Sequence, residues 1–427
     1  MAHVLQLTDG TATLTLTGGS YTLLDYTPIA TDPSTAATVT ISEDISLLVS
    51  GASTTAVQAS IHAIEQMLTY AANRAEFGTG PRVYVQYQVS GDAATYRSEV
   101  VGGYVDVTPD AIKAWVGGKS EILLHIKRRG WWENVAPTTL VTASARTNNG
   151  SADTVLLGGG AITGALPAPA IVEITNTATS ALYWDTFYLG ANAFNDPAGF
   201  TGYLNSTGAA ITWSAGATDS VMEAWSLNST MLADTAGDYF RVVVAFADTS
   251  SGTSPQSDIY LRVRVKYGVT ILARGGLVYT GPGVTKKVFD LGALPLPPGG
   301  YLTDNVPLTL EVTVTADAAS SVNHYIDFVQ LFPAGKGRFR RLEQIGYAVG
   351  LNDTLVDDPV TGLVYVKDYS DGNKRIPIVT QRGEPLMLWP GRACRITALF
   401  DESDADPYNP SRTYGLTVRY HPRRLSV

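Results

Sequence analysis

The chain has 427 residues, a formal charge of −9 and an isoelectric point near 5.1, and only 16% of its residues are charged. An acidic chain lacks the basic face that general affinity for nucleic-acid phosphates requires, so a DNA-binding role is disfavoured. Its length predicts two or three domains, and its abundance of threonine, serine, valine, alanine, tyrosine and glycine predicts a mainly β fold with many tight turns.

The N-terminus enters polar alternation at once, so we expect no signal peptide, and no run approaches the roughly 18 apolar residues of a membrane span. The single cysteine, Cys394, cannot form an internal disulfide. Its apolar neighbours in "ACRITALF" predict that it is a small buried side chain.

Residues 1–50 predict successive short strands, and residues 54–77 then predict one amphipathic helix. Ser53 is suited to cap its start, and Gly78 is suited to the left-handed position after its end. One face of this helix is apolar at the spacing of three to four residues and comprises Val57, Ile61, Ile64, Leu68, Ala71 and Ala75. A helix with one apolar face is expected to pack on a sheet.

The strands that follow, such as "PRVYVQYQV" and "SEILLHIKRRGWWE", complete a first domain over residues 1–135. Small polar residues near 136 indicate a boundary, and residues 136–335 contain only strand patterns, as in a two-layer β-sandwich. Residues 336–427 begin with the basic cluster "GKGRFRR" and return to strands. That cluster is interpreted as a solvated face, with docking on an acidic neighbour as the alternative.

The order of strands, a helix after "ISLLVSG", then "GPRVYVQYQ" and the closing "LLHIKRRGWWE" resembles the ring-forming domain of distal tail proteins and related tail-tip proteins of long-tailed bacteriophages. The resemblance implies a tail-tube-like β-sandwich with one packed helix, in which the helix covers one side of a ring protomer. The segments "GEPLMLWPGRACRITALFDE" and "YGLTVRYHPRRLSV" resemble the closing strands of such proteins, and they are expected to return to the ring domain or to pack on it. The alternative is that the terminal segment forms a small β-domain of its own.

Within the middle region, "VFDLGALPLPPG" and "HYIDFVQLFPAG" resemble late strands of a jelly-roll module of the galectin-like or carbohydrate-binding kind. The resemblance implies a module inserted into the ring protein and displayed outside it, where a host cell-surface glycan is a candidate ligand.

The sequence provides no catalytic constellation, so we expect no enzymatic activity and no cofactor. The five histidines are scattered and none forms a metal-binding i, i+4 pair: His3, His62, His125, His324 and His421. Neither a nucleophile elbow nor a phosphate-binding loop occurs, and "LGGGAITG" is interpreted as a loop.

Acidic residues gather in two turn-rich stretches, "LNDTLVDDPVTG" and "FDESDADPYNP". Their favoured role is to bind turn backbone through the side chain. The alternative is a structural calcium ion held by Asp401, Asp404 and Asp406, although the full calcium-loop pattern is missing. Asp327 in "YIDFV" resembles a calcium-binding position of some carbohydrate modules.

Aromatic residues of the middle region are the candidate glycan contacts, because an exposed ring can stack on the apolar face of a sugar. The candidates are Trp184, Tyr188, Trp213 and Trp225, with Tyr203 in the same region. Core placement is the alternative for each of them.

Two classes of function remain. The first is a structural virion protein made in the host cytoplasm and located at the tail tip, where six copies are expected to form a ring with tail-tube, tape-measure and tail-hub or adhesin proteins as partners. DNA would pass through the channel without specific binding, since like charges repel. A tail-tube subunit with a decoration domain is a variant of this class. The second is a carbohydrate-binding or carbohydrate-active protein.

Overall fold

The computed structural model describes residues 3–32, 34–36, 38–107, 118–147, 154–177, 182–191, 194–195, 209–213, 216–227, 239–248, 259–281, 288–295, 308–317, 320–335, 337–343, 348–370, 375–377, 380–402 and 412–427. The fold is mainly β, as the composition predicts. Contacts divide the chain into two compact units, one of residues 1–138, 163–168 and 420–427, and one of residues 139–162 and 169–419. No helix among the described residues combines the length and hydropathy that a membrane crossing needs.

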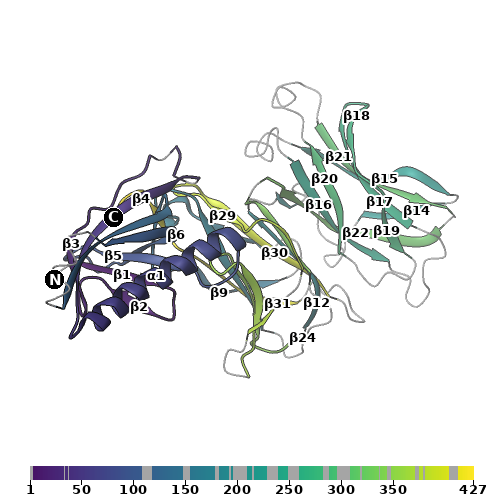
Figure 1. Cartoon of the computed structure of the whole chain (residues 1–427). Helices are drawn as coiled ribbons and strands as arrows, with labels where there is room; N and C mark the ends of the chain where they lie inside the picture. Colours follow the sequence, from purple (N-terminus) through teal and green to yellow (C-terminus); the bar gives the residue numbers. More distant parts are fainter. Residues whose placement is uncertain are drawn as a thin grey trace. The chain divides into compact units, whose positions relative to one another are not determined.

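The first unit is built on a nine-stranded sheet in the order β2-β1-β5-β6-β7-β4-β3, and β8 joins β32 to β6 (Figure 1). The strands are β1 (Val4–Thr8), β2 (Thr13–Thr15), β3 (Tyr21–Asp25), β4 (Thr40–Ser50), β5 (Val83–Gln88), β6 (Tyr96–Val107), β7 (Lys119–Arg129), β8 (Trp132–Asn134) and β32 (Arg423–Arg424). The longest pairing runs over eleven residues, from Thr40 opposite Arg129 to Ser50 opposite Lys119.

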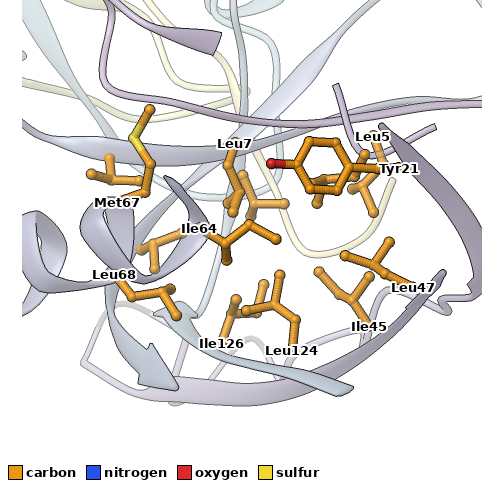
Figure 2. Close-up of a cluster of buried hydrophobic side chains, with 14 of the residues drawn as sticks. Leu5, Leu7, Tyr21, Ile45, Leu47, Ile64, Met67, Leu68, Leu124 and Ile126 are labelled. Atoms are coloured by element: carbon orange, nitrogen blue, oxygen red, sulfur yellow. The ribbon is translucent and has the colours of Figure 1, made fainter. Parts of the chain in front are cut away.

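Helix α1 (Thr54–Phe77) packs on this sheet, and both of its predicted ends are confirmed. The Ser53 side chain accepts a hydrogen bond from the Ala56 N–H at 3.2 Å, and Gly78 adopts the left-handed φ of 70° that ends the helix. Figure 2 shows Ile64, Met67 and Leu68 of the helix among buried side chains of the strands. The predicted apolar face is therefore confirmed, except that Ala75 is exposed and Met67 is buried instead.

The last eight residues of the chain return to the first unit. Arg423 pairs with Glu133 in the β8–β32 ladder, and Leu166 forms an isolated bridge with Arg423. The His421 Nδ1 lies 2.8 Å from the Asn134 carbonyl oxygen. Of the terminal segment, residues 420–427 thus belong to the first unit, whereas the strands before them belong to the second.

The second unit contains two sheets that share strands from both sides of the middle region. One has the order β10-β30-β12-β23-β28 with β24 on β12, and the other has the order β27-β26-β25-β11-β31-β9 with β29 on β11. The strands are β9 (Thr138–Thr147), β10 (Thr154–Leu157), β11 (Ala168–Asn176), β12 (Leu182–Ala191), β23 (Phe339–Glu343), β24 (Ala348–Val349), β25 (Thr354–Asp358), β26 (Leu363–Lys367), β27 (Arg375–Pro377), β28 (Thr380–Gly383), β29 (Met387–Leu388), β30 (Cys394–Glu402) and β31 (Thr413–Tyr420), with the short 3₁₀ helix η1 (Gly159–Ala161) after β10. Cys394 is buried, as predicted.

The remaining strands of the second unit form a jelly roll, which confirms that part of the predicted fold (Figure 1). One sheet has the order β13-β22-β16-β20 with β14 also on β22, and the other has the order β15-β21-β17-β18 with β19 on β17. In chain order, the first two strands, β13 and β14, both lie beside the last strand β22, and the next strand β15 lies beside the last but one, β21, as in a jelly roll. The strands are β13 (Phe194–Asn195), β14 (Ala209–Trp213), β15 (Ala217–Leu227), β16 (Tyr239–Asp248), β17 (Ile259–Tyr267), β18 (Thr270–Arg274), β19 (Val278–Gly281), β20 (Val288–Pro295), β21 (Leu308–Ala316) and β22 (Ser320–Pro333).

The jelly roll begins and ends at neighbouring points of the other two-sheet domain. Gly190 at the end of β12 is paired with Phe339 at the start of β23, and Phe194 of β13 is paired with Leu331 of β22. The strand pairing therefore groups residues 139–191 with the C-terminal strands, whereas the sequence places them in the middle module. Partners that are 150 residues apart leave no local pattern by which this grouping could be recognised.

Candidate functional site

The aromatic residues proposed as glycan contacts are buried where their side chains are described. Tyr188 is 1% exposed and packs with Phe332 and Phe339, and Trp225 is 7% exposed within the jelly-roll core. Burial corrects their assignment as sugar-stacking surfaces, because the core takes up both faces of such rings. The side chains of Trp184, Tyr203 and Trp213 lie outside the described part of the structure.

Two acidic side chains of "LNDTLVDDPVTG" accept hydrogen bonds from the backbone of nearby turns, as predicted. Asp353 accepts hydrogen bonds from the N–H groups of Gly350 and Tyr369, both at 2.9 Å, and Asp358 accepts one from the Val360 N–H at 2.9 Å. Of the residues proposed for calcium, Asp404 and Asp406 lie outside the described residues, and the side chains of Asp327 and Asp401 are not described. No group of three potential metal ligands occurs among the side chains that are described.

The basic cluster "GKGRFRR" is not a solvated face in its described part, which corrects that interpretation. Arg340 is 4% exposed, and its Nε lies 2.7 Å from the Asp357 carboxylate across the two sheets. Arg341 contacts Glu343 at 2.7 Å. The arginines of the cluster thus pair with acidic residues of the same unit.

A pocket of about 320 Å³ lies in the second unit beside this cluster. It is lined by Arg241 of β16, by Ala334, Gly335, Gly337, Phe339 and Arg341 from the turn between β22 and β23 and from β23, and by Arg382, Gly383 and Glu384 at the end of β28. Gly337 has a φ of 71°, and a Cβ atom at this position would collide with the Met387 side chain. Glycine is therefore required where this turn closes against β29.

The charges of the pocket are nearly balanced. Asp290 pairs with Arg241 and lies 3.5 Å from Arg341, while Glu343 lies 2.7 Å from Arg341 and 3.7 Å from Arg382. The buried Nε atoms of Arg241 and Arg341 make no hydrogen bond within the described part of the chain. The pocket is thus lined by guanidinium groups without an excess of positive charge.

The sequence singled out the basic cluster that lines one side of this pocket, but it gave no sign of the other lining residues. The turn between β22 and β23 falls within the basic cluster that the sequence singles out, but Arg241 and Arg382 lie far from it in the chain. Only the strand pairing brings these residues together, so no spacing pattern could have identified them.

Asp357 is the described carboxylate with the most unusual environment. It is 1% exposed, and burial raises the pKa of its carboxyl to about 6 even though the Arg340 charge opposes the shift. The Arg340 Nε lies 2.7 Å from the carboxylate, but neither Asp357 oxygen accepts a hydrogen bond of good geometry within the described part of the chain. The ionised form is therefore poorly stabilised in the folded state.

We expect the stability contributed by protonated Asp357 to be lost as the pH rises through about 6. The folded pKa lies above the ordinary value, so the folded state holds a proton that the unfolded state has released, and the free energy of unfolding falls between about pH 4 and 6. Urea unfolding of the wild type and of Asp357→Asn across this range measures the difference. A difference that does not vary with pH would show that Asp357 titrates normally.

No protein-family model matches the chain, and no curated protein matches it. Among solved structures, it is similar to two of the phage P2 baseplate in its activated conformation, one with Ca and one with Sr. They align over 96% of this chain and 100% of theirs, with 10% and 9% identity and TM-scores of 0.24 and 0.25.

Proposed function

We propose that the chain is a structural subunit of a phage tail tip, in which the first unit forms a closed ring and the jelly roll is a peripheral module. A role without catalysis is part of this proposal. It is supported by the sequence resemblance and, above all, by the asymmetry of the nine-stranded sheet, whose described helix α1 covers one face.

The helix-bearing face of the sheet is apolar. Ile45 of β4 and Leu124 and Ile126 of β7 are at most 1% exposed in the cluster that includes α1 (Figure 2). Alternate residues of a strand point to opposite faces, so Asp44 and His125 project away from the helix. A sheet that is sealed on one side by its own helix leaves the other side for neighbouring copies and a channel.

Polar groups dominate the centre of that other face. His125 Nδ1 lies 2.6 Å from Asp44 Oδ1, His125 Nε2 lies 3.5 Å from Asp106 Oδ2, and the imidazole stacks on Tyr104 with ring centroids 4.4 Å apart. Tyr104 is 56% exposed. Such a mixture of charged and aromatic groups suits a polar contact between subunits better than it suits a core.

The jelly roll is suited to a module that can be added to a ring protomer without disturbing it. The chain leaves β12 and returns at β23 through paired residues, Gly190 and Phe339. An insertion whose ends are adjacent can be removed without separating the strands on either side of it. We place this module on the outside of the ring.

Mass photometry of the purified full-length chain is expected to show a closed oligomer, most simply of six copies, and negative-stain images are expected to show rings. A variant in which residues 192–336 are replaced by a short Gly-Ser linker should retain the ring, because the first unit is untouched. A wild type that stays monomeric at micromolar concentration, together with virions that lack the chain, would refute the proposal.

A further inference from the structure

One outer face of the jelly roll carries a row of cations that the proposed ring function does not use. Along β17, the inward residues Ile259, Leu261, Val263 and Val265 are at most 1% exposed. The alternate residues Tyr260, Arg262, Arg264 and Lys266 therefore project outward from the sheet β15-β21-β17-β18. With Arg274 of β18 opposite Arg264, they form what we call the cationic row.

The cationic row has more positive charges than the carboxylates that pair with it. Glu311 lies 3.0 Å from Lys266 and is paired with Arg264, which faces it directly across the β17–β21 ladder. Desolvation raises the pKa of Glu311, but hydrogen bonds and charges from these two cations outweigh it and hold the pKa below its ordinary value, so Glu311 remains ionised at neutral pH.

Asp219 provides the second carboxylate, and it lies 3.1 Å from Arg262 and 3.7 Å from Arg274. Its φ of 48° is unusual for a residue other than glycine, at an irregularity in the pairing of β15. Among the described residues, two carboxylates therefore pair with these four cations. The surplus is notable in a chain whose formal charge is −9.

Hydroxyl and aromatic groups surround the row. Thr309, Thr313 and Thr315 of β21 lie opposite Lys266, Arg262 and Tyr260. At one end, the rings of Tyr260 and Tyr279 lie 5.2 Å apart, and Tyr279 is 37% exposed. The face thus combines positive charge, hydroxyl groups and aromatic surface along one extended strand.

We propose that this face binds an acidic polysaccharide that bears carboxylate groups. The guanidinium groups match the planar carboxylates of uronate sugars through paired hydrogen bonds, and the tyrosine pair can stack on the apolar face of a sugar. The modest positive surplus of the row suits a polymer that carries one carboxylate per sugar.

The test measures binding of the full-length chain to polygalacturonate by biolayer interferometry, with neutral dextran and oligothymidylate as comparison ligands. The wild type is expected to bind polygalacturonate selectively, and its affinity is expected to fall as sodium chloride is raised from 50 to 300 mM, because salt screens the attraction between the polymer carboxylates and the cationic row. The double variant Lys266→Gln, Arg274→Gln should bind at least about tenfold more weakly.

The matched control is Lys367→Gln, which removes a charge from an exposed strand position in another sheet of the same unit. It should bind as the wild type does, and unchanged melting of all variants excludes loss of folding. Failure of the wild type to bind polygalacturonate, equal binding by the double variant, or tighter binding of oligothymidylate would overturn the proposal. Ring formation is measured separately, so either proposal can fail alone.

Discussion

Replacing Ile64 with aspartate is expected to abolish the cooperative folding of the first unit. Ile64 is fully buried on the sheet-facing side of α1, among Leu124, Ile126 and other side chains of the strands (Figure 2). An unpaired carboxylate at this position costs several kcal/mol, which is comparable to the whole stability of a domain. Thermal unfolding followed by circular dichroism measures the effect.

The control for Ile64→Asp is Ala75→Asp on the same helix. Ala75 is exposed, so the same new charge remains in water and should change the free energy of unfolding by no more than about 0.5 kcal/mol. A melting temperature of Ile64→Asp equal to that of the wild type would mean that the apolar face of α1 does not pack on the sheet.

The helix was predictable because its signals are local. A capping serine, a left-handed glycine and an apolar spacing of three to four residues all lie within one segment. The exception is Ala75, which lies on the predicted face but is exposed. Its burial depends on how far the sheet extends beneath the last turn of the helix, and the helix sequence does not contain that information.

The jelly-roll fold could be predicted from the sequence. The pairing of the strands that precede it with the strands that follow it could not. Each strand shows its own alternation, yet the pairing of β12 with β23 and β30 joins residues on both sides of a long insertion. The candidate sites show the same limit. Arg340 is buried because Asp357 faces it from the other sheet, and no pattern within "GKGRFRR" reports that partner.

The cationic row, by contrast, is visible in the sequence once its strand is known. "IYLRVRVKY" alternates apolar and polar residues with a period of two, so three cations are expected on one face. The carboxylates that neutralise part of this charge come from β15 and β21. The sequence therefore indicates the row, whereas the size of its charge surplus follows only from the register.

A buried ion pair holds the segment after β3 to the first unit. Arg128 of β7 is fully buried and binds the Glu43 carboxylate of β4 through two nitrogens, with Nε 2.8 Å from Oε2. Glu43 also accepts hydrogen bonds from the Tyr26 hydroxyl at 2.9 Å and the Ile29 N–H at 2.7 Å. Arg128 donates to the Ile29 carbonyl oxygen at 2.8 Å and lies over the Trp132 ring.

Arg128 and Glu43 each have a buried counter-ion only while the other is present. Burial, reinforced by the adjacent Glu43 carboxylate, raises the pKa of Tyr26 far above its ordinary value, so its hydroxyl remains a donor throughout the physiological range. Removal of either charge leaves the other buried without its counter-ion, and this typically costs about 3–5 kcal/mol.

Arg128→Met and Glu43→Gln are each expected to lower the free energy of urea unfolding of the first unit by about 3–5 kcal/mol. The double variant should lose clearly less than the sum of the two, because no uncompensated charge then remains. The control is Glu65→Gln, whose partner His62 is 78% exposed, and it should change stability by no more than about 0.5 kcal/mol. If the single losses add in the double variant, Arg128 and Glu43 act independently, and the segment after β3 is held by packing rather than by the ion pair.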